Sequence, residues 1–291
     1  MSIKHEAIVR IGGARSNTEN LSGIKGFFLF ISSLTNNWYL IKNLAWRQIS
    51  IKYRGSMFGM LWAVFTPLLL LSVYTFVFSV IFSHRWEVLL KDKTNFALFL
   101  FAGLICHQFL AECITRSPGL LIENKTYVKK IIFPLEILAW VQIITTLFSF
   151  CVSLSILLLM YVALFGLPPV TALLLPLAFM PLIFLGLGIS WLFATLGVFY
   201  RDMRHVTPIL VILIMFLTPI FYPIQAVPEK YVIFINLNPE AGIVTFVRDM
   251  LFFGNMPNIY HLAVIWLVSI LFASLSARLF LHMKRSFADV I

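Results

Sequence analysis

Six stretches of this chain are each long and apolar enough to cross a lipid bilayer. A membrane-spanning helix needs about 20 mostly apolar residues, and the stretches cover approximately residues 60–82, 96–115, 135–165, 172–199, 206–224 and 260–282. Hydrophobic residues make up 60% of the chain and charged residues only 12%, which excludes both a water-soluble fold and intrinsic disorder. We therefore predict an all-α polytopic membrane protein with six transmembrane helices.

Lys and Arg residues are distributed unequally between the two sides of the predicted spans. With the N-terminus inside the cell, 17 of the 22 basic residues are cytoplasmic and 5 lie outside. Cytoplasmic loops carry an excess of Lys and Arg, so we predict that both termini are cytoplasmic. The cations lie at the ends of apolar runs, so the net charge of +10 favours anionic lipid over nucleic acid as a partner.

Residues 35–54, just before the first span, combine aromatic, apolar and basic side chains at approximately helical spacing. A basic amphipathic helix next to a span tends to lie in the interface, with its aromatic rings at the lipid head groups and its cations on the phosphates. We predict such an interfacial helix, and a plain juxtamembrane anchor is the alternative. Its predicted membrane-interface residues are Trp38, Lys42, Arg47, Lys52, Tyr53 and Arg54.

The cytoplasmic stretch between the second and third spans contains a short amphipathic helix, at about residues 120–130. Ser117-Pro118-Gly119 ends the second span before it, and Phe133-Pro134 closes the stretch at the membrane edge. A short helix held between two rigid spans can bury side chains in a groove of a soluble partner and transmit force from it. An ordinary basic loop is the alternative, and composition alone favours that alternative.

The outer stretch 225–258 is too apolar for a solvated loop. It contains YVIFI (231–235) and GIVTFVRDMLFF (242–253), each too short to cross the membrane. Such pieces suggest re-entrant or interfacial helices, because bent backbone at membrane depth is tolerated only against protein or beside water. We predict re-entrant helices that form an outer gate, with Tyr231, Phe234, Phe246 and Phe252 as gate residues.

Aromatic side chains are abundant, with 29 Phe, 9 Tyr and 7 Trp residues. Most aromatic stripes in membrane helices face lipid or pack within the bundle. The alternative is a smooth wall along which a sugar polymer slides, because aromatic faces contact the C–H groups of a sugar without fixing its hydroxyls. The candidates for lining such a conduit are Phe58, Trp62, Phe65, Phe76, Phe216, Phe221 and Tyr222.

Ionisable residues are scarce within the predicted spans. Glu112 and Arg116 are four residues apart on one helix face and can pair. We interpret His107 as a hydrogen-bonded packing residue rather than a proton carrier. The sequence contains no paired acids, no His/Asp/Ser arrangement and no zinc-ligand spacing. We therefore predict no catalytic residue and no metal site.

Four blocks of sequence together resemble the transmembrane subunit of ABC-2 type exporters, in particular the permeases for O-antigen, capsule and teichoic-acid polymers. The blocks are IKYRGSMFGMLWAVFTPLL (51–69), LIENKTYVKKIIFPLEI (121–137), VFYRDMRHVTPIL (198–210) with LTPIFYPI (217–224), and LNPEAGIVTFVRDMLF (237–252). Because of this resemblance, we interpret residues 120–130 as a helix that docks on a partner rather than as an ordinary basic loop.

The resemblance implies a homodimeric permease in the bacterial cytoplasmic (inner) membrane, bound to two copies of a separate nucleotide-binding subunit. ATP and Mg belong to that partner, because this sequence has no G-x-x-x-x-G-K-[ST] phosphate loop and so binds no cofactor of its own. A lipid-linked polysaccharide is expected to pass between the protomers. The ATPase-coupling residues implied are Leu121, Glu123, Asn124, Lys125, Tyr127, Lys129, Lys130, Phe133 and Pro134.

The resemblance also divides the chain, with 1–34 as a cytoplasmic extension, 35–285 as the transmembrane domain and 286–291 as a cytoplasmic tail. The expected function is export of an O-antigen-like polysaccharide by a transporter permease that is not itself an enzyme. Export of a capsule or teichoic-acid polymer, or of a small drug or lipid, is the alternative. A channel or carrier independent of an ATPase is a further alternative, from a different functional class.

Overall fold

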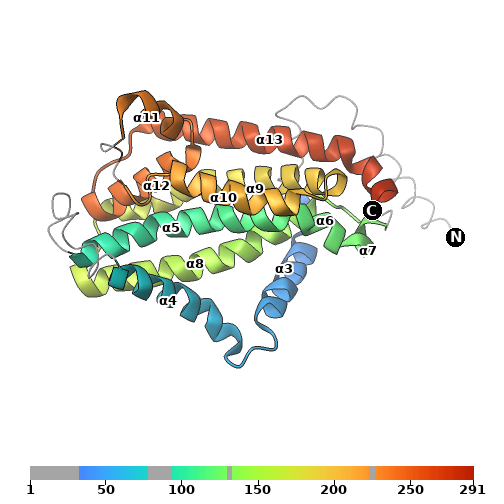
Figure 1. Cartoon of the computed structure of the whole chain (residues 1–291). Helices are drawn as coiled ribbons and strands as arrows, with labels where there is room; N and C mark the ends of the chain where they lie inside the picture. Colours follow the sequence, from blue (N-terminus) through green and yellow to red (C-terminus); the bar gives the residue numbers. More distant parts are fainter. Residues whose placement is uncertain (1–32, 78–92, 130–132, 223, 225–226) are drawn as a thin grey trace.

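The computed structural model describes residues 33–77, 93–129, 133–222, 224 and 227–291. Within these residues the regular structure is helical and includes no β-strand, so the predicted all-α polytopic fold is confirmed. The long helices lie side by side in one bundle (Figure 1). Most of the predicted extension 1–34, residues 78–82 of the first predicted span and Lys130 fall outside the described residues.

Among the described residues, five helices are long and apolar enough to cross a membrane. Four of them are α5 (Lys93–Arg116), α8 (Ile137–Phe165), α9 (Leu175–Phe199) and α13 (Ile259–Val290). The fifth combines the short 3-10 turn Gly59–Leu61 with α4 (Trp62–Phe76). In chain order, α4, α5, α8, α9 and α13 correspond to the first, second, third, fourth and sixth predicted spans. Helix α13 continues through most of the predicted tail.

The fifth predicted span is a shorter helix than the sequence suggested. Helix α10 (Met203–Leu217) has 15 residues, which reach about 22 Å at 1.5 Å per residue and fall short of the roughly 30 Å hydrocarbon core. It ends because Thr218 precedes Pro219, and a residue before proline favours an extended backbone; Thr218 has φ −92° and ψ 132°. The apolar residues that follow were predicted as a continuation of the helix, but they form a turn.

Helix α9 lies at the centre of the bundle and packs against α13, α5 and α8. Small residues allow these close approaches, as in other membrane helix pairs. A Cβ atom at Gly188 would meet Phe272 and the backbone of Ala273 on α13, and one at Gly197 would collide with the backbone of Pro118. The buried Trp191 of α9 donates a hydrogen bond to the Glu136 carbonyl oxygen over 3.3 Å.

The stretch predicted as an interfacial helix forms helix α3 (Trp38–Tyr53). It lies across one end of the bundle, at an angle to the long helices (Figure 1). Its buried face packs on α8 and consists of Ile41, Leu44, Ala45 and Ile49. The chain then turns into α4 through Gly55 and Gly59, whose φ angles of 87° and 52° favour glycine.

The outer stretch between α10 and α13 folds into short helices, as predicted. They are α11 (Glu229–Asn236), α12 (Pro239–Arg248) and a π-helical turn over Asp249–Phe253. Helix α11 lies toward the end of the bundle opposite α6 (Leu120–Glu123), α7 (Lys125–Val128) and the C-terminus (Figure 1). The predicted coupling and gate segments are therefore far apart in the molecule.

Candidate functional site

The predicted coupling helix at 120–130 is two short helices, α6 and α7, joined at Asn124. The Asn124 side chain donates a hydrogen bond to the Leu120 carbonyl oxygen over 2.8 Å, and its backbone leaves the helical region at φ −106° and ψ 28°. Leu120 and Leu121 are buried, whereas Glu123 and Lys125 are exposed. The segment is thus anchored by its apolar side and presents charges outward.

Neighbouring elements hold this segment in place. Arg47 of α3 donates a hydrogen bond from Nη2 to the Tyr127 hydroxyl over 3.2 Å. The Tyr127 ring stacks on Phe133, with ring centroids 4.5 Å apart. Arg204 of α10 lies 3.5 Å from Glu123 between Nη2 and Oε1. Exposed ion pairs contribute little stability, so these contacts position the segment against α3 and α10 rather than stabilise the fold.

A basic cavity of about 350 Å³ lies beside this segment. Lys125, Arg201 and Arg204 line it together with apolar residues of α6, α9 and the chain end. Lys129 is also exposed at this end of the bundle. The described basic residues predicted for coupling therefore face outward beside a positively charged hollow, which suits an acidic surface of a partner protein.

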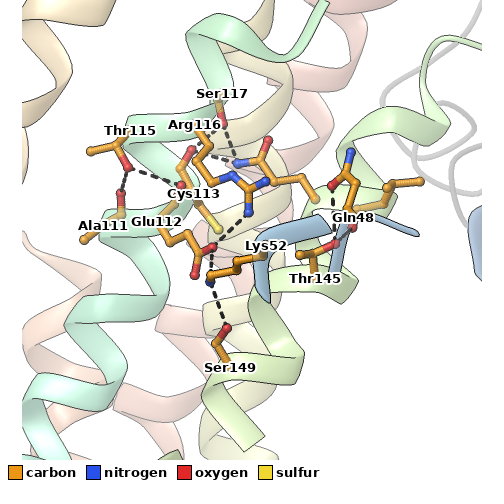
Figure 2. A network of polar contacts seen from close by, with 12 residues as sticks. Gln48, Lys52, Ala111, Glu112, Cys113, Thr115, Arg116, Ser117, Thr145 and Ser149 are labelled. Carbon is orange, nitrogen blue, oxygen red and sulfur yellow. Dashed lines mark hydrogen bonds and ion pairs between the residues drawn. The ribbon is translucent and has the colours of Figure 1, made fainter. Parts of the chain in front are cut away.

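A polar network joins α3 to the end of α5 and to α8 (Figure 2). The Glu112 carboxylate is 2.9 Å from Arg116, which confirms the predicted pair, and 2.9 Å from the Lys52 ammonium. Lys52 also donates to the Ser149 hydroxyl over 3.1 Å. The sequence analysis placed Lys52 with lipid phosphates and missed this contact, because the two partners are 60 residues apart.

A second layer of this network binds α8 to the end of α5. The Gln142 amide donates to the Cys113 carbonyl oxygen over 3.1 Å and to the Ser117 hydroxyl over 3.0 Å. The Ser117 hydroxyl also bonds the Cys113 carbonyl. These buried hydrogen bonds therefore join α8 to the turn that follows α5.

The predicted conduit residues of the first span lie together. Phe58, Trp62 and Phe65 form an edge-to-face cluster with ring centroids 5.7 to 6.3 Å apart. Their exposed fractions are 49%, 37% and 40%, so the cluster lies on the outward face of α4. Phe76, at the end of α4, is also exposed.

The predicted conduit residues of the fifth span lie on α10 and on the turn after it. Phe216 is exposed, whereas Phe221 and Tyr222 are partly buried. Tyr222 donates a hydrogen bond to the Phe216 carbonyl oxygen over 2.8 Å. Both α4 and α10 pack on α5. Their exposed aromatic faces are therefore open to lipid or to a second copy of the chain.

The predicted gate residues of the outer stretch fall into two groups. Tyr231 and Phe234 on α11 are exposed, whereas Phe246 is buried. The partly buried Phe252 lies edge-to-face with Phe99 and Tyr161, at centroid distances of 5.6 Å each. Of these four residues, only Tyr231 and Phe234 are exposed enough to contact another molecule. Phe246 and Phe252 pack the outer stretch against the bundle.

Arg248 is a residue of evident structural importance that the sequence analysis treated only as an outer charge. It is 5% exposed, and its guanidinium donates to the carbonyl oxygens of Phe99, Pro219 and Ile220 over 3.0, 2.6 and 3.0 Å. These bonds tie α12 to α5 and to the turn that ends α10. The sequence did contain a signal for this role, because Arg248 is a cation inside the apolar run GIVTFVRDMLFF. Charged residues within the membrane are functional candidates by default.

The start of α12 is held by a buried pair. His107 Nδ1 and Glu240 Oε1 are 2.9 Å apart, and the two residues are 5% and 1% exposed. Asn238 caps the helix by accepting a hydrogen bond from the Glu240 backbone N–H over 3.0 Å. The prediction that His107 is a hydrogen-bonded packing residue is confirmed. Helix α12 is therefore fixed at both ends, by Glu240 and by Arg248.

Comparison with known proteins gives a match over residues 39–252 to the family described as ABC-2 type transporter. The O-antigen export system permease protein RfbA of Klebsiella pneumoniae is 26% identical over 247 residues, covering 84% of this chain and 92% of that protein. RfbA of Myxococcus xanthus is 24% identical over 254 residues, covering 87% and 95%. The polysialic acid transport protein KpsM of Escherichia coli is 25% identical over 234 residues, covering 79% and 89%.

Proposed function

The chain belongs to the ABC-2 type transporter family, and we propose that it is the permease of an ATP-driven exporter of a lipid-linked, O-antigen-like polysaccharide. The observation that carries the proposal is the similarity, along most of the chain, to proteins named as O-antigen export permeases. The five long apolar helices provide the membrane-spanning body that such a permease needs. The proposed location is the bacterial cytoplasmic (inner) membrane, with both termini in the cytoplasm.

ATP hydrolysis in this proposal belongs to a separate nucleotide-binding subunit, which also holds Mg. Residues 120–129 are the proposed docking element, because they are anchored by Leu121 and expose Glu123, Lys125 and Lys129. The basic cavity beside them adds Arg201 and Arg204 to the proposed docking surface. Two copies of the permease and two of the ATPase are the proposed assembly.

A displacement of the docking element has two described routes into the bundle. One route is the chain itself, since α6 follows α5 through the single turn Ser117–Gly119. The other runs from Tyr127 to Arg47 on α3, and from Lys52 on α3 to Glu112 on α5. Movement driven by ATP is thereby expected to shift α3, α5 and α8 together.

The polymer path proposed here runs between two protomers, along the aromatic face of α4. The exposed Phe58, Trp62 and Phe65 cluster supports this path because it offers ring faces without charged groups. The similarity to the polysialic acid transport protein favours one second candidate, the export of a capsule-type polymer by the same mechanism.

A gene deletion in the source bacterium tests the proposed function. Without the permease, surface polysaccharide should disappear while lipid-linked polymer accumulates on the cytoplasmic face of the inner membrane, and a plasmid copy of the gene should restore the surface polymer. Immunoblots of surface polysaccharide and of the inner-membrane fraction measure both pools. Unchanged surface polysaccharide in the deletion strain would refute the proposed function.

A further inference from the structure

A cavity of about 200 Å³ lies among α3, α4, α5 and α8, next to the Lys52–Glu112 pair. Its polar lining includes Gln108, Glu112, Ser149 and Ser153. Thr146 also lines it. Amides, hydroxyls and a carboxylate offer both donors and acceptors of hydrogen bonds, so the lining suits a ligand rich in hydroxyl groups.

Aromatic rings complete the lining. Trp62 and Phe109 border the cavity, and Trp62 also belongs to the exposed cluster with Phe58 and Phe65. Apolar walls with a few placed polar groups are the usual composition of small-ligand sites, whose volumes run from roughly 300 to 1,000 Å³. This cavity is smaller, so it can admit one ring but not a length of polymer.

The charged side chains of the lining are already paired. Lys52 is the only cation and Glu112 the only anion among the described lining residues, and the two are 2.9 Å apart, with Arg116 also 2.9 Å from Glu112. A phosphate or an acidic sugar would therefore find no unpaired cation among the described lining residues, and burying its charge without a partner is costly. A neutral polyhydroxyl ring avoids that cost.

We propose that this cavity binds a single neutral sugar residue of the exported polymer, an inference that rests on the proposed function. The sugar hydroxyls hydrogen-bond to Glu112, Gln108 and Ser149, while an apolar face of the ring packs on Trp62. Because Trp62 also borders the exposed aromatic face, a polymer on α4 can turn one residue into the cavity. The bound sugar then lies against the Lys52–Glu112 contact that joins α3 to α5.

Protection of an introduced cysteine from labelling tests the site in the purified permease–ATPase complex in nanodiscs. The background is Cys151→Ser, since Cys151 is exposed and the other two cysteines are buried. Ser153→Cys places a thiol in the cavity lining, and Ser155→Cys is the matched control, because Ser155 is exposed on the same helix outside the lining. The probes are neutral sugars and oligosaccharides released by acid hydrolysis of the cells' own exported polymer, with inorganic phosphate as the anionic probe.

Neutral sugars should slow N-ethylmaleimide labelling of Ser153→Cys in a saturable manner and leave Ser155→Cys unchanged. Adding Ser149→Ala should weaken the apparent affinity about fivefold, as expected for one lost neutral hydrogen bond. If Ser153→Cys does not fold, Gln108→Cys provides a second thiol in the lining. Equal labelling with and without neutral sugars, or protection by phosphate alone, would overturn the proposal.

Export assays on the same variants separate this proposal from the proposed function. ATP-dependent export together with unprotected labelling of Ser153→Cys would overturn the sugar site alone. Export that needs no ATPase subunit would overturn the proposed function, whatever the labelling shows.

Discussion

At the scale of single residues, two polar side chains connect elements that are distant in the sequence. Glu112 accepts contacts from Lys52 and Arg116, and Arg248 donates to carbonyl oxygens on α5 and after α10. Arg248 is buried and Glu112 is partly buried, and a buried polar group without a partner is costly. Each residue therefore fixes the relative position of its neighbours more than an exposed pair would.

Replacing Arg248 with Met should destabilise the outer end of the bundle. The change leaves the carbonyl oxygens of Phe99, Pro219 and Ile220 without their donor, and we expect a loss of about 2–4 kcal/mol. Thermal unfolding of the purified permease measures the effect. Lys230→Met is the control, because Lys230 is an exposed cation on α11 and its replacement should change the unfolding temperature little. Equal unfolding temperatures for the two variants would contradict the assigned role of Arg248.

The Lys52–Glu112 contact should appear as an energetic coupling between the two residues. Their side chains are 36% and 17% exposed, so we expect a coupling of about 0.5–1 kcal/mol rather than the larger value of a fully buried pair. A double-mutant cycle with Lys52→Ala and Glu112→Gln measures it from unfolding free energies. Additive effects of the two substitutions would show that α3 is not held by this contact.

The sequence predicts such residues only when their partners are local. Glu112 and Arg116 were identified as a pair because a spacing of four places both on one helix face. The contact with Lys52 and the three bonds of Arg248 depend on how separate helices pack, which hydropathy and spacing do not specify. His107 was correctly interpreted as a packing residue, although its partner Glu240 is 133 residues away and was not predicted.

At the scale of elements, the apolar runs predicted the helices well, but not where local chemistry interrupts them. Helix α10 stops at Leu217 because Pro219 follows Thr218, and the docking segment divides at Asn124. Apolar residues continue after Leu217, and residues that favour a helix continue after Asn124. The average hydropathy therefore did not predict either break. Helix α3 and the short outer helices lie where the sequence predicted helices, because each has a strong local pattern.

Substituting both Lys125 and Lys129 with Ala should weaken docking of the ATPase subunit without impairing membrane insertion. The two cations are exposed at the end of the bundle, where they are expected to meet acidic groups of the partner. Co-purification of the ATPase and polymer-dependent ATP turnover measure docking and coupling. Lys230→Ala, on the exposed surface of α11, is the matched control. Wild-type copurification and turnover in the double variant would refute the docking role.

The aromatic face of α4 should be accessible to water if it lines the polymer path. Single cysteines at Phe58, Trp62 and Phe65, in a Cys151→Ser background, should react with a membrane-impermeant thiol reagent in the assembled complex. A cysteine at Leu275, an exposed apolar position on α13, should remain unreactive as a lipid-facing control. Unreactive cysteines at all three aromatic positions would place the cluster against lipid and contradict its proposed role in lining the polymer path.

At the scale of the whole molecule, the segments proposed for docking, for the polymer path and for the outer gate lie at different places in one bundle. The docking segment and the basic cavity lie at one end, and α11 lies toward the other. Helices α4 and α10, which both pack on α5, expose apolar side chains to lipid or to a second copy. We propose that a second copy covers these faces, which provides a shared path that a single chain does not enclose.

Transport into inverted membrane vesicles tests the central claim of a permease driven by a separate ATPase. Vesicles containing the permease, its nucleotide-binding partner and lipid-linked polysaccharide are supplied with ATP, and polymer protected inside the lumen is measured. Protected polymer should accumulate only when both subunits and hydrolysable ATP are present, and an ATPase-inactive partner should abolish it. Accumulation with the permease alone, or with the inactive partner, would contradict the account.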